Sequence, residues 1–236
     1  MLYVIGDIET TGFNTKLDNI LEFGYIMIDE KLNIDRSGTL WFYKPEWKIE
    51  GTENVNGLTR KFLAEDYLNI FGVRERVESY NEFLKYTLTS DEGSLQRYWE
   101  DNFKINIMTL RTLFEKCLFI GKNSRNFDIP FIKDFIDKNL YIDCFPPIAD
   151  VDVQPLMTKY YKAFCNAIGK PVSSRKVGTL EEQFIATGFT FKDADELYDK
   201  LNGPAERKKA HGALYDCCMT YFVLKYLIEQ NEVSLK

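Results

Sequence analysis

The 236-residue sequence lacks any apolar run long enough to span a membrane, since a spanning helix needs about 20 consecutive apolar residues. Its N-terminus also lacks the basic segment and the small-residue cleavage site of a secretory signal peptide. Internal repeats and low-complexity segments are absent as well. These absences argue against a membrane-spanning protein and against a secreted one.

Disulfide and zinc-binding patterns of cysteine are missing too. The five cysteines are odd in number and show no C-x-x-C spacing. We therefore expect reduced, partly buried thiols in a cytoplasmic protein, and neither a disulfide framework nor a zinc site. The cysteines are Cys117, Cys144, Cys165, Cys217 and Cys218.

An excess of positive charge is also missing, because the net charge is −6. Proteins that grip long duplex DNA usually carry a strongly basic face, so the charge argues against a sequence-specific duplex binder. An acidic chain can still bind a few nucleotides at a chain end if its cleft concentrates positive charge or holds metal ions. Since 45% of the residues are apolar and 15% aromatic, we expect a globular chain, with one domain or two small ones.

Five short apolar stretches predict the strands of a mixed α/β sheet with helices packed on it. The first three are rich in β-branched and aromatic residues. A polar stretch at residues 30–37 reads as a turn, so these three are expected to form an antiparallel meander. The expected strands span residues 2–9, 20–29, 38–44, 117–121 and 148–151.

Helices are expected between and after these strands. Residues 58–116 read as mostly helical, a helix follows at residues 129–139, and another ends at Phe164. Residues 169–175 read as a loop. The clearest helix is the last, where an apolar stripe recurs at spacings of three and four with polar residues opposite. The stripe consists of Leu214, Cys217, Cys218, Tyr221, Leu224 and Ile228.

Two carboxylates, Asp7 and Glu9, stand two residues apart on the first expected strand, so they project from the same face. Apolar residues on both faces mark this strand as central and buried. Like charges at its end repel and lose hydration, which a divalent cation relieves, and hard oxygen ligands favour Mg²⁺ or Mn²⁺. Thr10, Thr11 and Gly12 add hydroxyls and an open turn for a ligand. Taken alone, the pair is better explained as a solvated acidic turn.

The only histidine, His211, precedes Asp216 by five residues. Five residues turn about 140° around a helix, so we expect His211 on the loop before the last helix and Asp216 in its first turns, both reaching one cleft. Histidine titrates near neutrality and can take a proton from water. A solitary histidine is nevertheless more often a surface or satisfied residue. Asp128, at the start of the helix expected at residues 129–139, reads by itself as a helix cap.

Together, these segments resemble the motifs of the DEDDh branch of the DnaQ-like exonucleases. Residues 7–12, D-I-E-T-T-G, are similar to the first motif, residues 123–131 to the second, and residues 211–216, with the spacing H-x-x-x-x-D, to the third. Residues 54–59 resemble a weaker landmark between the first two. The sister branch has a tyrosine four residues before the last aspartate, where this sequence has Gly212, so the histidine branch is the one resembled.

The resemblance implies a ribonuclease H-like fold: a mixed five-stranded sheet flanked by helices, in a single domain over residues 1–236. A helical insertion is expected at about residues 62–105, which could shape the substrate entrance or a protein contact, or be a surface elaboration. Lys122 and Asn56 stand where many relatives have histidine, which leaves the details of the substrate open.

The same resemblance implies a metal-dependent 3′-to-5′ exonuclease that releases nucleoside 5′-monophosphates from DNA or RNA. Asp7, Glu9, Asp128 and Asp216 would hold two Mg²⁺ or Mn²⁺ ions about 3.5–4 Å apart. One ion would orient a water molecule that His211 deprotonates, and the other would stabilise the leaving 3′ oxygen. These five residues are therefore the expected catalytic residues.

Substrate contacts are expected around them. A phenylalanine, Phe13 or Phe127, could stack on a base, although Phe127 is better explained as a core residue. Phosphate contacts could come from Lys122, Arg125, Arg175 and Lys176, or from the favoured basic run at residues 207–209, against which a solvated surface competes. The expected substrate-binding residues are Thr10, Thr11, Gly12, Phe13, Asn123 and Lys209.

The expected partner is the 3′ end of a nucleic acid, single-stranded rather than duplex. One rival interpretation is a catalytically silent module that binds nucleic acid or protein, against which the presence of all five catalytic residue types argues. Another is the proofreading subunit of a polymerase. The sequence ends at Lys236, soon after the last expected helix, which favours a stand-alone enzyme or a homodimer.

Overall fold

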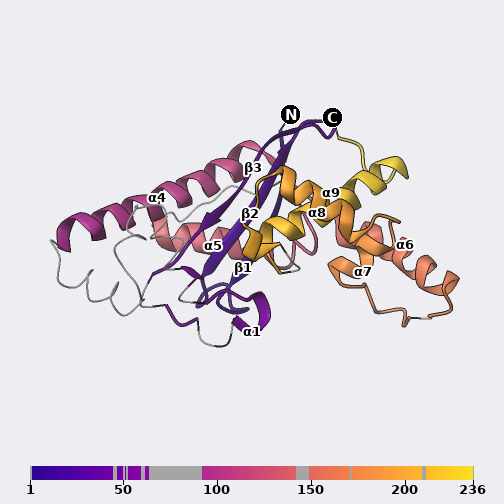
Figure 1. Cartoon of the computed structure of the whole chain (residues 1–236), viewed down its shortest axis with the longest axis horizontal. Helices are drawn as coiled ribbons and strands as arrows, with labels where there is room; N and C mark the ends of the chain where they lie inside the picture. Colours follow the sequence, from indigo (N-terminus) through magenta and orange to yellow (C-terminus); the bar gives the residue numbers. More distant parts are fainter. Residues whose placement is uncertain are drawn as a thin grey trace.

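A five-stranded sheet forms the centre of the computed structural model, with the strand order β3-β2-β1-β4-β5 (Figure 1). Strand β2 pairs antiparallel with both β1 and β3. Strand β4 pairs parallel with both β1 and β5, so the sheet is mixed, as predicted. The strands are β1 Tyr3–Thr10, β2 Ile20–Ile28, β3 Ile34–Trp41, β4 Leu118–Gly121 and β5 Asp150–Asp152. The structure describes residues 2–44, 47–49, 51, 53–59, 62–63, 92–141, 149–170, 172–208 and 211–235.

Helices cover both faces of the sheet (Figure 1). One face carries α4 (Glu92–Lys116) and α5 (Asp128–Leu140). The other face carries the helices of the C-terminal half, and the short helices α1 and η2 contribute to the loops around the site. These remaining helices are α1 Glu53–Asn56, α6 Val153–Ala167, α7 Leu180–Ile185, α8 Phe191–Lys200, η2 Ala205–Arg207 and α9 Ala213–Glu229.

Strand β1 lies in the middle of the sheet because it is apolar on both faces. Ile8 packs into the core beneath α4 and α5, whereas Tyr3 and Ile5 pack into the core that contains α9. Side chains alternate along a strand, so Asp7 and Glu9 continue the row of Tyr3 and Ile5. Both carboxylates therefore project from the same face, as their spacing predicted, and this face is the one that α9 covers.

The turn between β2 and β3 is shorter than the sequence indicated. The Asp29 carboxylate accepts hydrogen bonds from the backbone amides of Lys31 and Asn33, each at 2.8 Å, and closes a tight hairpin. Strand β3 consequently begins at Ile34, not at Gly38 as expected. A side chain that caps its own turn is a local signal, and it accounts for this error.

Helix α9 forms as predicted, but its first half is buried on every side. All of residues 213–220 are buried, because β1 and β2 lie on one side of the helix and α6, α7 and α8 on the other. The polar residues opposite the apolar stripe in this half, Asp216 and Thr220, are therefore buried as well. Close packing depends on Gly24 of β2, where a Cβ atom would lie 2.2 Å from the Leu214 backbone nitrogen.

Two other predictions are only partly covered by the described residues. The insertion expected at residues 62–105 falls largely on residues 64–91, which lie outside them, and its last part belongs to α4, which begins at Glu92. Cys144 also lies outside, while the four cysteines within the described part are buried free thiols, as expected. None of the described helices combines the length and the apolar character that a bilayer crossing requires.

Candidate active site

A cleft of about 670 Å³ opens at the C-terminal end of β1. Its walls come from β1 and the loop after it, from α1, from the turn between β4 and α5, from the start of α7 and from the loop before α9. Segments from both halves of the chain thus meet in one cavity. All five predicted catalytic residues line it: Asp7, Glu9, Asp128, His211 and Asp216.

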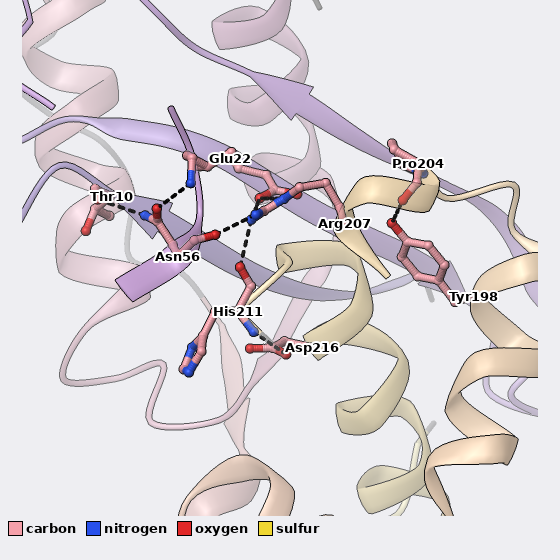
Figure 2. A network of polar contacts seen from close by, with 9 residues as sticks. Thr10, Glu22, Asn56, Tyr198, Pro204, Arg207, His211 and Asp216 are labelled. Carbon is pink, nitrogen blue, oxygen red and sulfur yellow. Dashed lines mark hydrogen bonds and ion pairs between the residues drawn. The ribbon is translucent and has the colours of Figure 1, made fainter. Parts of the chain in front are cut away.

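Three of these side chains form a tight group. Potential ligand atoms of Glu9, His211 and Asp216 all lie within 4.8 Å of one another. His211 stands on the loop before α9 and Asp216 in the first turn of the helix, as predicted, and the His211 backbone amide donates to Asp216 Oδ1 at 3.3 Å (Figure 2). Asp7 and Asp128 line the same cleft outside this group.

Asp128 is not the cap of α5, which answers the alternative interpretation of its position. The cap residue is Phe127, and Asp128 is the first helical residue. Its side chain is buried, at 3% exposure, and accepts a hydrogen bond from the backbone amide of Ile8. Asp128 therefore lies beside β1, the strand that carries Asp7 and Glu9.

The carboxylates of the cleft are electrostatically strained. The pKa values of Asp7 and Glu9 are raised well above their ordinary values, mainly by burial. The negative charge of Asp216 is the second cause in both residues. Burial likewise raises the pKa of Asp128 to about 7 and that of Asp216 to about 8. A cluster of buried carboxylate oxygens beside an imidazole is a donor set that suits a hard divalent cation, so the residues present fit a metal site.

The three residues after Glu9 line the cleft but also stabilise their own turn. The Thr10 hydroxyl donates to the Gly12 carbonyl at 2.6 Å, and the Thr11 hydroxyl donates to Asp18 at 3.3 Å. A Cβ atom on Gly12 would lie 2.4 Å from an Asp18 carboxylate oxygen. The need for glycine at this position is therefore explained by the turn itself, without a ligand.

Two further predicted substrate contacts stand at the rim. Phe13 is 84% exposed, and its ring centroid lies 6.2 Å from that of the half-buried Phe127. Asn123 adopts a left-handed conformation, with φ of 61°, and its backbone amide donates to Asp152 at 2.9 Å. Among the basic candidates within the described residues, Lys122 lines the cleft, and its charge lowers the pKa of Asp128.

Of the basic run before His211, the structure describes Arg207 and Lys208, and both pair with acidic residues. Lys209 lies outside the described residues. Arg207 is 2% exposed and forms an ion pair with the buried Glu22, and Lys208 pairs with Asp199 at 2.7 Å. The predicted phosphate contact is wrong for Arg207, because a buried, paired guanidinium is not accessible to a substrate.

One carboxylate of the cleft was missed in the sequence. Glu181 lies in the first turn of α7 and lines the cleft. Burial is the largest cause of the raised pKa of Asp216, and the negative charge of Glu181 is the second. The capping box of Thr179 and Glu182 is a sequence signal for the start of a helix. This signal would have placed Glu181 in the first turn of that helix.

No family model matches the chain. A stretch of 111 residues, 47% of the chain, is 32% identical to the DNA polymerase III PolC-type of Ureaplasma parvum serovar 3, of which it covers 7%. Among solved structures, Escherichia coli exonuclease I in complex with a dT13 oligonucleotide aligns over 97% of this chain with a TM-score of 0.58 and 17% identity. Exonuclease I from Methylocaldum szegediense aligns over 97% with a TM-score of 0.56 and 19% identity.

These likenesses show that the chain shares the fold of exonuclease I, a mixed sheet flanked by helices. They confirm both the predicted ribonuclease H-like fold and the predicted resemblance to the DnaQ-like exonucleases. The chain spans 41% and 40% of the length of the two exonuclease I chains.

Proposed function

We propose that this protein is a metal-dependent 3′-to-5′ exonuclease that removes nucleoside 5′-monophosphates from the 3′ ends of single-stranded nucleic acid. The observation that carries the proposal is the convergence of four carboxylates and the single histidine in one cleft. These residues come from β1, the start of α5, the loop before α9 and the first turn of α9.

In this proposal, Asp7, Glu9, Asp128 and Asp216 hold divalent cations, Mg²⁺ or Mn²⁺. Bound cations supply positive charge that activates water and stabilises the leaving oxygen. The exposed imidazole of His211 takes a proton from the attacking water while the water oxygen forms a bond to the phosphorus. The bond between the phosphorus and the 3′ oxygen of the preceding nucleotide then breaks.

The rim residues support a single-stranded substrate. An exposed ring such as that of Phe13 offers a stacking surface for a terminal base, and stacking is available to any unpaired base. Lys122 supplies a positive charge inside an otherwise acidic cleft. The related fold of exonuclease I has been solved with a dT13 oligonucleotide, and with a zinc ion and single-stranded DNA, which supports a single-stranded DNA end as the first substrate to test.

The test is a panel of single-stranded and duplex DNA and RNA oligonucleotides, labelled at the 5′ end and incubated with Mn²⁺. We expect a ladder of products that shorten from the 3′ end. The ladder would establish the direction of hydrolysis, and a comparison across the panel would identify the preferred nucleic acid. Asp7→Ala, His211→Ala and Asp216→Asn should each nearly abolish the ladder, and so should chelation. Glu196→Gln, an exposed carboxylate on α8, serves as the matched control. Full turnover by Asp7→Ala, or binding of oligonucleotides without any hydrolysis, would contradict the proposal.

A second candidate is a proofreading exonuclease that works with a polymerase. The observation in its favour is the 32% identity to part of a DNA polymerase III PolC-type. Such an enzyme should remove a mismatched primer terminus faster than a matched one and should co-purify with a polymerase. Sedimentation of the purified chain would at the same time test the predicted homodimer.

A further inference from the structure

One buried guanidinium joins β2, α1 and the loop before α9, of which α1 and the loop contribute to the walls of the cleft (Figure 2). Arg207 donates to the Glu22 carboxylate through Nε at 3.2 Å and Nη2 at 2.5 Å. Its Nη1 donates to the Asn56 carbonyl at 2.5 Å, and Nη2 also donates to the His211 carbonyl at 2.7 Å. The side chains of Arg207 and Glu22 are 2% and 1% exposed, so this network is shielded from water.

The His211 backbone needs such support. Its φ of 63° lies in the left-handed region, which costs free energy for a residue with a side chain. Its amide donates to Asp216 and its carbonyl accepts from Arg207, so both polar groups of the strained residue are held. This backbone conformation is the one that carries the imidazole to within 4.8 Å of Glu9 and Asp216.

The third arm of the network reaches the strand that bears the carboxylates. The Asn56 side-chain amide donates to the Thr10 carbonyl at 3.3 Å, and its oxygen accepts from the Leu58 amide at 3.0 Å. Arg207, through the Asn56 carbonyl, therefore ties the His211 loop to the segment directly after Glu9.

We propose that Arg207 is a positioning residue that fixes the imidazole of His211 against Glu9 and Asp216. Only a forked, planar group with several fixed donors can serve Glu22, Asn56 and His211 together, and a lysine ammonium cannot reproduce this geometry. The expected effect of Arg207 on hydrolysis rests on the proposed exonuclease function. Its effect on the position of the His211 imidazole does not.

The test exploits the single histidine, since one ring gives one set of imidazole signals in an NMR spectrum of the untagged protein. Arg207→Lys keeps a positive charge beside Glu22 but loses the fork. We expect its His211 signal to move and sharpen toward that of a freely rotating ring. With nucleic acid and Mn²⁺, we expect kcat to fall roughly 10- to 100-fold while KM stays within about twofold.

A second variant keeps the test decisive if Arg207→Lys fails to fold. Glu22→Gln combined with Arg207→Met removes both charges of the buried pair and the Arg207 donor to the His211 carbonyl, so it should fold and show the same change in the ring signal. Arg36→Lys, at an exposed ion pair with Asp35, is the matched control and should leave signal and kcat unchanged.

The outcomes separate this inference from the proposed function. A folded Arg207→Lys or double variant with the wild-type ring signal and kcat overturns the positioning role and leaves the nuclease proposal intact. A wild-type protein that hydrolyses no substrate overturns the nuclease proposal, and the ring signals still decide whether Arg207 holds the imidazole.

Discussion

Glu9 and Glu22 lie directly opposite each other on the antiparallel strands β1 and β2. Like charges in this position destabilise a sheet, and the charge of Glu22 contributes to the raised pKa of Glu9 after burial and Asp216. Arg207 pairs with Glu22 and lowers the pKa of Glu9. The buried arginine therefore compensates for an acidic residue that the sheet places beside the candidate metal site.

Removal of this compensation should be costly. We expect Arg207→Ala to lower the free energy of unfolding by about 3–5 kcal/mol, because the buried Glu22 carboxylate would lose its ion pair with Arg207. Glu22→Gln added to Arg207→Ala should restore part of the loss. Urea denaturation measures both effects, and a loss below about 1 kcal/mol in the single variant would contradict a large contribution of this buried ion pair to stability.

The raised pKa values predict how the metal-free protein responds to pH. A carboxyl group whose pKa is higher in the folded state stabilises the fold at low pH and ceases to do so as pH rises through the folded pKa. For Asp128 and Asp216 the folded values are about 7 and about 8, against ordinary values of 3.8. The melting temperature in a chelator should therefore fall between pH 5 and about pH 8.5.

The same groups provide the control for this pH response. Asp128→Asn removes one buried charge and should raise the melting temperature of the metal-free protein at pH 8 and flatten its dependence on pH. The total effect should be a few kcal/mol, at about 1.4 kcal/mol per unit of pKa difference. A melting temperature that rises with pH in the chelated wild type would contradict the burial of these charges.

Cation binding should reverse the instability. At a Mn²⁺ concentration about 100-fold above the dissociation constant, binding stabilises the fold by about 2.7 kcal/mol, which corresponds to a rise in melting temperature of roughly 5–10 °C for a chain of this size. Asp7→Asn should lose most of this rise, and Glu196→Gln should keep it. An equal rise in wild type and Asp7→Asn would place the bound cation elsewhere.

Close packing of α9 on β2 should matter for activity as well as for stability. Gly24 pairs with Asp7 across the strands, and a Cβ atom there would lie 2.2 Å from the backbone of α9. We expect Gly24→Ala to cost at least 1–3 kcal/mol and to slow hydrolysis, because α9 carries Asp216. Gly38→Ala on β3 is the matched control, since the nearest atoms to its added methyl group are those of the Tyr25 side chain, with the hydroxyl at 3.0 Å and two ring carbons at 3.2 Å. Equal effects of both changes in denaturation and turnover would contradict this account.

Local patterns were sufficient to predict the parts of the site that lie within one element. The two-residue period of a strand placed Asp7 and Glu9 on one face, and the spacing from His211 to Asp216 placed one on a loop and the other on a helix. The position of Asp128 beside β1 depends on packing between distant segments. Only the resemblance to a known family anticipated it.

The supporting network could not be predicted in this way. Arg207 stands in a basic run, which is usually a solvated surface, and its partner Glu22 is 185 residues away in the sequence. Burial of the first half of α9 was missed for a related reason. Residues that alternate in polarity on a helix can all be buried when layers enclose it on both sides, and the sequence of α9 alone does not reveal the second layer.

We propose that Asp7, Glu9, Asp128 and Asp216 together hold divalent cations in the cleft that His211 borders. Anomalous scattering from crystals soaked in Mn²⁺ tests it most directly. We predict strong anomalous peaks within coordination distance of these carboxylates. Well-diffracting, Mn²⁺-saturated crystals with no peak in the cleft would contradict the metal site and the exonuclease mechanism built on it.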